Sequence, residues 1–90
     1  MTHNETTSFR EEKLRGMVRR LMGNKVAGRA IARDESLVDI GLTSLDVVKL
    51  MLALEGELDL TIPESELTPA NFRSLESIET MLDRIGAPRR

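Results

Sequence analysis

Residues 39–46, Asp-Ile-Gly-Leu-Thr-Ser-Leu-Asp, constrain the fold more than any other part of the sequence. Gly41 supplies a permissive backbone for a turn. Thr43 is a good helix N-cap, and Asp46 follows three residues later, which is the spacing of a capping box. A helix is therefore expected to begin at Ser44, whose hydroxyl would lie at the positive end of the helix dipole, where negative charge is best tolerated.

The helix that starts at Ser44 is predicted to span residues 44–58 and to carry two apolar arcs. The first is the expected core stripe, formed by Val47, Leu50, Met51, Leu54 and Leu58. The second arc, about 60° wide at 100° per residue, holds Leu45, Val48 and Leu52. These three residues either widen the core face or form an exposed contact strip beside Ser44, and the sequence leaves both possibilities open.

Apolar residues at helical spacing predict further helices on both sides. A first helix follows a cap at Thr7 or Ser8 and stops at Gly23-Asn24, and residues 24–43 then form a long connection anchored by Ile31, Leu37 and Ile40. Thr68-Pro69 predicts a very short helix through Phe72, and Ser74 caps a last helix that ends at Gly86 and Pro88. The buried side of the first helix is predicted to be Leu14, Met17, Val18, Leu21 and Met22, and that of the last Leu75, Ile78, Met81, Leu82 and Ile85.

Composition limits the chemistry of the chain. It has 90 residues, no cysteine, a single histidine (His3) in a polar segment, and two phenylalanines as its only aromatic residues. One small aliphatic core is expected, without disulfides or thiolate metal sites. No apolar run approaches the about 20 residues of a membrane span, and the first eight residues lack the pattern of a secretory signal, so a cytoplasmic location is the default expectation.

Charge is distributed unevenly along the chain. Residues 1–33 hold eight basic and three acidic side chains, whereas residues 34–66 hold nine acidic side chains and one basic one, Lys49. An acidic surface around Ser44 would favour basic partner enzymes and disfavour nucleic acid there. Ser44 also has no candidate base in the sequence, and a serine without an activating base is a poor nucleophile near neutral pH. The chain is therefore not expected to be an enzyme.

The Asp39-x-Gly41-x-x-Ser44-Leu45 pattern followed by an apolar helix resembles the attachment motif of acyl and peptidyl carrier proteins. Asp34–Leu37 upstream, and Leu50–Glu55 and Leu60–Glu64 downstream, extend the resemblance to about residues 9–86. It implies an all-α fold, a small four-helix bundle with three main helices and one short helix. Its domain would span residues 9–86, between a flexible tail of residues 1–8 and a tail of residues 87–90.

The resemblance also implies a cofactor and partners. In the family the serine carries 4'-phosphopantetheine, so Ser44 is the expected attachment site. The expected cofactor-binding residues also include Asp39 and Gly41, which shape the turn, and Thr43, which caps the helix. The expected partners are a phosphopantetheinyl transferase, an acyl- or aminoacyl-loading ligase and downstream synthases or transferases, with no nucleic acid and no membrane, and the protein is expected to be a monomer. The expected partner contacts are Leu45, Asp46, Val48, Lys49 and Leu52.

Two positions depart from the fatty-acid type of this family. Thr43 stands where that type has an aspartate before the serine, and Lys49 stands at a position that is commonly acidic. The motif looks more like that of specialised free-standing carriers, some of which serve polyketide or peptide pathways. Others are charged with an amino acid by a ligase resembling an aminoacyl-tRNA synthetase.

Two hypotheses of other classes remain open. The chain could be an unmodified helical adaptor that uses Leu45, Val48 and Leu52 as its contact strip. It could also bind nucleic acid through the basic segment 10–33, although this segment lacks interleaved aromatic residues and a recognisable binding motif.

Overall fold

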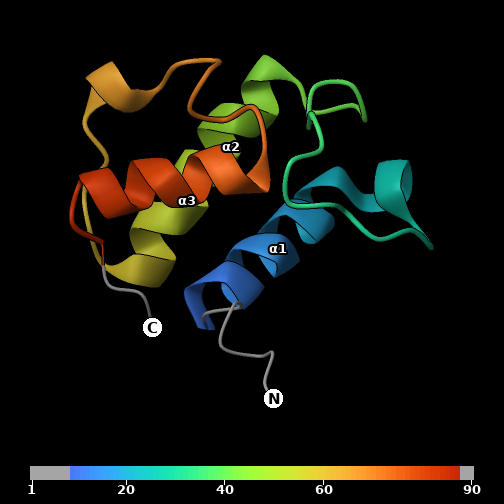
Figure 1. Cartoon of the computed structure of the whole chain (residues 1–90), viewed down its shortest axis with the longest axis horizontal. Helices are drawn as coiled ribbons and strands as arrows, with labels where there is room; N and C mark the ends of the chain where they lie inside the picture. The colour runs from blue at the N-terminus through green and yellow to red at the C-terminus, as the bar shows by residue number, and fades with distance from the viewer. Residues whose placement is uncertain (1–8, 88–90) are drawn as a thin grey trace.

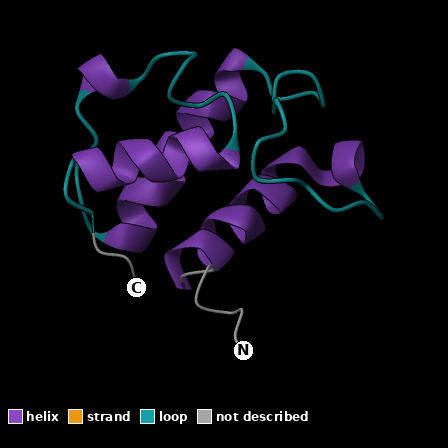
Figure 2. Ribbon diagram, viewed as in Figure 1, coloured by secondary structure: helices purple, strands orange, loops and turns teal. Residues whose placement is uncertain are grey.

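The described part of the chain, residues 9–87 of a computed structural model, is all-helical and contains no strand (Figures 1 and 2). The predicted caps Thr7 and Ser8, and the predicted terminator Pro88, lie outside these residues. The elements are α1 (Phe9–Met22), the 3-10 helix η2 (Gly23–Val26), α2 (Ser44–Leu58), the 3-10 helix η3 (Glu64–Glu66) and α3 (Leu75–Arg84). The predicted all-α class with three main helices is thus confirmed.

The helix α1 ends where the sequence predicts, but a 3-10 helix follows it directly instead of a loop. Gly23 has φ +54°, a left-handed conformation that favours glycine and breaks the α-helical hydrogen bonding. One turn of 3-10 helix, η2, then follows and buries Val26. Of the predicted apolar stripe of α1, four residues are buried and Leu21 is half-buried.

The long connection predicted for residues 24–43 is shorter than expected, because its first residues belong to η2, and residues 27–43 contain no α-helix or 3-10 helix. Ile31 and Leu37 are buried as expected, Ile40 is half-buried, and Leu42 is a further buried anchor. Hydrogen bonds join this segment to the start of α3: Leu37 N–H donates to the carbonyl of Arg73 at 2.8 Å, and Glu76 N–H donates to that of Arg33 at 2.9 Å. The connection is therefore fixed against α3 before it reaches Ser44.

The prediction of a short helix from Pro69 to Phe72 is wrong in its position. Residues 69–72 form a single turn, in which Phe72 N–H donates to the Thr68 carbonyl at 3.3 Å and the Thr68 hydroxyl accepts from Asn71 N–H at 3.2 Å. The short helical element lies earlier, at η3. Thr68 does cap a turn. The turn does not extend into a helix, because the chain buries Phe72 and then begins α3 at the Ser74 cap only two residues later.

The helix α3 has a complete capping box at its start. The hydroxyl of Ser74 accepts from Ser77 N–H at 3.1 Å, and that of Ser77 accepts from Ser74 N–H at 2.9 Å. Four of the five predicted core residues of α3 are buried, and Ile85 is half-buried just beyond the end of the helix.

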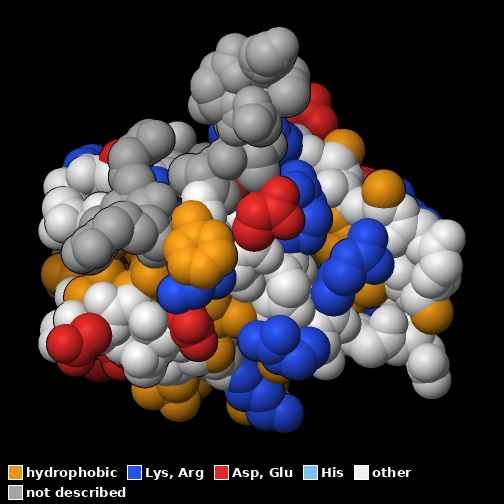
Figure 3. Space-filling view, turned by 90° about the horizontal axis from the view of Figure 1, so that it is seen from below, with side chains coloured by type: hydrophobic (Ala, Val, Ile, Leu, Met, Phe, Trp, Pro, Cys, Tyr) orange, Lys and Arg blue, Asp and Glu red, His pale blue; other side chains and the backbone are white. Residues whose placement is uncertain are grey.

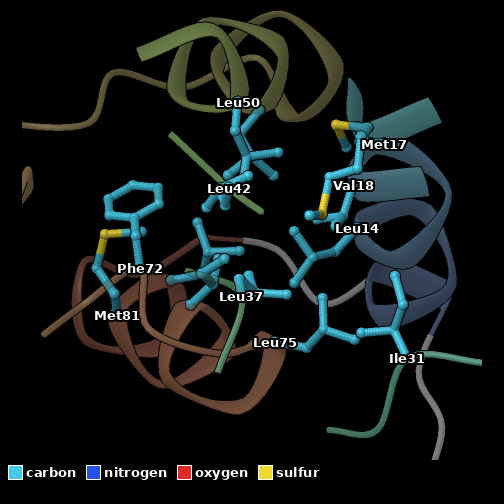
Figure 4. Close-up of a cluster of buried hydrophobic side chains, with 14 of the residues drawn as sticks. Leu14, Met17, Val18, Ile31, Leu37, Leu42, Leu50, Phe72, Leu75 and Met81 are labelled. Atoms are coloured by element: carbon cyan, nitrogen blue, oxygen red, sulfur yellow. The ribbon is translucent and has the colours of Figure 1, made fainter. Parts of the chain in front are cut away.

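The core is aliphatic apart from Phe72, as the composition predicts (Figure 4). Leu14, Met17 and Val18 of α1 point toward side chains from the connection, from α2 and from α3, labelled in Figure 4 as Leu37, Leu42, Leu50, Leu75 and Met81. Each of the three α-helices thus contributes one face to a single core. Among residues 9–87, no helix combines the length and apolar character needed to cross a bilayer.

A buried cation closes one end of this core. Arg10 is fully buried and bonds Glu79 Oε1 through Nε at 3.0 Å, Asp83 Oδ1 at 2.7 Å and the carbonyl of Ala87 at 3.2 Å. These contacts tie the first turn of α1 to α3 and to the residue that follows it. The charge is satisfied inside the protein by carboxylates and a carbonyl, as burial of a guanidinium requires.

Candidate functional site

The turn that leads to Ser44 is built on the backbone of Leu37. Its carbonyl accepts from Leu42 N–H at 2.9 Å and from Ile40 N–H at 3.2 Å, and the Val38 carbonyl accepts from Gly41 N–H at 3.0 Å. Leu37 and Leu42 are both buried, so the two ends of the turn are anchored in the core. The chain therefore arrives at Thr43 from a fixed position.

Gly41 is the residue that makes this turn possible. Its φ is +114°, which side-chain-bearing residues rarely adopt. A Cβ atom at this position would lie 2.7 Å from Cδ of Lys25, whose ammonium bonds the Gly41 carbonyl at 2.7 Å and lies 3.8 Å from Asp46 Oδ2. Lys25 belongs to η2, sixteen residues upstream, and covers the turn.

We expect Gly41→Ala to lower the free energy of unfolding by about 1–3 kcal/mol, because alanine is strained at positive φ and would displace Lys25. Urea denaturation measures the loss. Gly56→Ala is the matched control: Gly56 lies in α2 with open space around it, so this change should stabilise the protein by about 0.5–1 kcal/mol. Equal effects of the two substitutions would contradict the strained-turn explanation.

A complete capping box begins α2, as the sequence predicts. The Thr43 hydroxyl accepts from Asp46 N–H at 3.1 Å, and Asp46 Oδ2 accepts from Thr43 N–H at 2.9 Å. The box uses the residues on both sides of Ser44 and leaves Ser44 itself at the first position of the helix. It thereby fixes the backbone of Ser44 without engaging its hydroxyl.

The pKa of Asp46 is lowered, first by the hydrogen bond from Thr43 N–H and further by the charges of Lys25 and Lys49. Because the folded pKa lies below the unfolded value of about 3.9, the contribution of Asp46 to stability is complete above that value. It is lost as the pH falls through the lowered pKa.

Asp46→Asn should therefore flatten the fall in the urea midpoint between about pH 5 and pH 2 relative to the unmodified sequence. Arg29 and Ala32 N–H lower the pKa of Glu35 in both proteins, so the difference between the two curves isolates Asp46. Parallel curves would show that Asp46 does not stabilise the folded state through its charge.

Ser44 is exposed, and among residues 9–87 its hydroxyl has no hydrogen-bond partner. Within the same residues, no group of three or more His, Asp or Glu side chains is placed to hold a metal ion. The hydroxyl is therefore presented to solvent, and it bonds to no group of residues 9–87 that could act as its base. Such a group can accept a substituent in the active site of a separate enzyme.

A hollow of about 470 Å³ opens beside Ser44, between α2 and the turn at residues 67–72. Its lining is mostly apolar and comes from the connection, from the start of α2 and from that turn: Val38, Leu42, Thr43, Ser44, Val47, Val48, Leu67, Thr68, Pro69 and Phe72. An extended substituent on Ser44 could lie along this surface. Sequence reasoning missed the hollow, because its walls come from three separate segments.

The question of the second apolar arc of α2 is settled by exposure. Leu45, Val48 and Leu52 are 62%, 38% and 57% exposed, whereas Leu50, Leu54 and Leu58 are buried. Val47 and Met51, predicted for the core stripe, are half-buried at its edge. The three exposed residues form an apolar strip that runs along α2 from Ser44 and do not widen the core.

Asp39 lies in the same turn but does not bond across it. Its backbone N–H donates to the Ser36 hydroxyl at 3.4 Å, and within residues 9–87 its exposed carboxylate has no recorded partner. The hydrogen bonds of the turn come instead from backbone groups and from Lys25, which sequence reasoning missed. The role of the Asp39 side chain stays a prediction.

Comparison with known proteins identifies relatives of this chain. Residues 12–82 match the family described as "Phosphopantetheine attachment site". Aminoacyl carrier protein 1 of Bradyrhizobium diazoefficiens is 45% identical over 66 residues, which are 73% of this chain and 73% of the relative. Aminoacyl carrier protein 2 of the same organism is 37% identical over 86 residues, 94% of this chain and 96% of the relative.

Solved structures with the same fold come from complexes of a ligase. The chain is similar, with a TM-score of 0.69 and 45% identity over 80% of its length, to a chain in the crystal structure of "Bradyrhizobium japonicum glycine:[carrier protein] ligase complexed with glycylated carrier protein". It covers 96% of that chain, which by its size is the carrier. A carrier protein from Agrobacterium tumefaciens, complexed with an engineered form of that ligase, matches at 25% identity with a TM-score of 0.72, over 81% of this chain and 97% of the other.

Proposed function

Because the chain belongs to the phosphopantetheine-attachment family of carrier proteins, we propose that Ser44 carries the 4'-phosphopantetheine arm and that the cargo is an amino acid. The observation that carries this proposal is the exposed, unengaged hydroxyl of Ser44 at the capped start of α2. When bound, the arm supplies a thiol that holds the cargo as a thioester.

The residues around Ser44 fit such a substituent. A phosphodiester on Ser44 would lie at the N-terminus of a 15-residue helix, where N–H groups and the helix dipole favour negative charge. The ammonium of Lys25 adds a positive charge on the side of Gly41 and Asp46. The hollow lined by Val47, Leu67 and Phe72 offers an apolar surface next to the attachment point.

In this proposal the chain positions a reactive group and leaves the chemistry to its partners. The turn and the capping box hold the backbone of Ser44, while the base that removes its proton belongs to a phosphopantetheinyl transferase. A loading ligase and a downstream transferase then act on the same arm. Tethering the cargo raises its effective concentration wherever the domain docks.

The identity of the relatives supports an amino-acid cargo over a fatty acyl or polyketide cargo. Two relatives are named aminoacyl carrier proteins, and a similar carrier is described as glycylated in its complex with a ligase. Thr43 and Lys49, where the fatty-acid type has acidic residues, agree with a different set of partners. We therefore propose a ligase that activates an amino acid as the loading partner.

Intact mass spectrometry tests the proposal in two steps. Incubation with coenzyme A and a broad-specificity transferase should add the mass of one phosphopantetheine, and fragmentation should place it on Ser44. Subsequent incubation with ATP, glycine and the B. japonicum ligase should then add one glycyl group. A chain that takes no arm would favour the unmodified adaptor, whereas a chain with the arm that the ligase does not charge would contradict the amino-acid cargo alone.

A further inference from the structure

We propose that Lys25 is a positioning residue, which holds Ser44 in the orientation that a phosphopantetheinyl transferase requires. The ammonium of Lys25 bridges two parts of the site, the Gly41 carbonyl at 2.7 Å and the Asp46 carboxylate at 3.8 Å. The inference rests on the proposed carrier function and adds to it a residue from η2, a different element of the fold. Because its recorded bonds go to the turn and to the capping box, Lys25 acts on Ser44 through the backbone.

The side chain of Lys25 reaches the site from a fixed starting point. Lys25 lies in η2, and its neighbour Val26 is buried in the core. The Ala27 N–H donates to the Asn24 carbonyl at 3.3 Å and closes the backbone around Lys25. The ammonium is therefore carried by a backbone that packing and a hydrogen bond hold in place, although 47% of the side chain is exposed.

Gly41 provides the room for the aliphatic part of this side chain. A Cβ atom at Gly41 would lie 2.7 Å from Cδ of Lys25 and 3.5 Å from both its Cγ and its Cε, so the stem crosses directly over the glycine. The missing side chain thus serves two purposes, since it permits the positive φ and leaves space for the stem. Lys25 and Gly41 form a matched pair from two separate segments.

The ammonium of Lys25 completes the hydrogen bonding of one peptide unit, that between Gly41 and Leu42. On one edge of this unit, the Leu42 N–H donates to the Leu37 carbonyl at 2.9 Å. On the other edge, the recorded donor to the Gly41 carbonyl is Lys25, and no backbone N–H in the described part of the chain replaces it. Two bonds on opposite edges fix the orientation of the planar peptide. Since Thr43 follows directly, they also fix the entry into α2.

The same ammonium faces the oxygen that caps α2. Asp46 Oδ2 lies 3.8 Å from Lys25 Nζ and also accepts from Thr43 N–H. Lys49 is the other cation that acts on Asp46, but both residues belong to α2, so Lys49 cannot join α2 to another element. Lys25 brings its charge from η2 and thereby joins η2, the turn and the capping box.

Loss of this bridge is expected to loosen the turn without unfolding the protein. The bonds of Lys25 are those of a half-exposed side chain, which contribute little to global stability. Locally, however, the Gly41 carbonyl loses its donor, and the turn opens more often. A transferase that binds only the closed turn then meets a smaller competent fraction of the chain, which raises KM and leaves kcat unchanged.

Amide hydrogen exchange of the full chain without the arm tests the bridge directly. Lys25→Met removes the charge but keeps a long apolar stem, and should speed the exchange of the Leu42 and Thr43 amides by about threefold or more. The Ile78 amide, in α3, should keep its exchange rate within about twofold. Lys25→Arg retains a positive charge and should restore most of the lost protection.

Transfer of phosphopantetheine from coenzyme A tests the consequence for attachment. Lys25→Met should raise the KM of the transferase for the chain by about threefold or more and change kcat by less than about twofold. Lys25→Arg should return KM to within about twofold of the value for the unmodified sequence.

A control has to separate the bridge from a general effect of positive charge, because lysine and arginine side chains gather on one face of the molecule (Figure 3). Lys13→Met is this control. It removes the same charge, but from a pair with Glu57 at the far end of α2 from Ser44. It should change both KM and the exchange of the Leu42 amide by less than about twofold.

Unchanged exchange of the Leu42 and Thr43 amides in Lys25→Met would overturn the proposal even if KM rises, because Lys25 would then not hold the turn. Faster exchange with an unchanged KM would overturn it as well, and so would an equal effect of Lys13→Met. If the unmodified sequence accepts no arm, the carrier function is rejected and the attachment role of Lys25 with it, whereas the exchange result on the bridge stands by itself.

Discussion

Alanine in place of Ser44 is expected to abolish attachment of phosphopantetheine while leaving the fold unchanged. The hydroxyl is exposed and makes no recorded hydrogen bond among residues 9–87, so its loss removes the acceptor of the arm but no contact of the folded state. The free energy of unfolding should change by less than about 0.5 kcal/mol. Intact mass after incubation with coenzyme A and a transferase measures the first effect, and urea denaturation measures the second.

Ser65→Ala is the control for this substitution, because Ser65 is an exposed serine in η3, away from the capped start of α2. It should accept the arm as fully as the unmodified sequence. An arm found on the Ser44→Ala protein would refute the assignment of the site. A large loss of stability would instead show that the serine is needed for the fold.

Arg10→Met is expected to have the largest effect on stability. Methionine keeps much of the apolar volume but leaves the carboxylate of Glu79, a residue only 7% exposed, without the cation that neutralises it. Breaking a buried ion pair by removing one partner costs about 3–5 kcal/mol, a large part of the stability of a domain of this size. Urea denaturation at neutral pH measures the loss.

Two further variants separate burial from charge. The double substitution Arg10→Met with Glu79→Leu removes both members of the buried pair and should recover a large part of the loss. Arg84→Met breaks an ion pair with Glu66 whose arginine side chain is half exposed, and should cost no more than about 1 kcal/mol. If Arg10→Met proves as mild as Arg84→Met, the buried cluster does not hold α1 to α3.

Local signals in the sequence were sufficient for the three α-helices and for the start of α2. The capping boxes of Thr43 with Asp46 and of Ser74 with Ser77 join residues three apart, so the atoms that bond are already close in the chain. The positive φ of Gly41 is likewise a property of one residue and its neighbours. For this reason the position of Ser44 could be predicted without knowledge of the packing.

The prediction of the short third helix failed because local signals were not sufficient there. Thr68 and Pro69 do begin a turn, but burial of Phe72 and the nearby Ser74 cap limit its length. The helix propensity of the residues favours a helix at such a position, but tertiary contacts decide whether the first turn extends into a helix.

What the sequence determined by itself was the helical class, the caps and the serine at the first position of α2, because each depends on residues within one or two turns of one another. Only the tertiary structure decided which charges are paired. Arg10 meets Glu79 across 69 positions, Lys25 meets the Gly41 carbonyl across sixteen, and Glu57 meets Lys13 on another helix. Counting charges along the chain therefore predicts an acidic surface, but it cannot show that packing gives Asp46, Glu55 and Glu57 partners inside the protein.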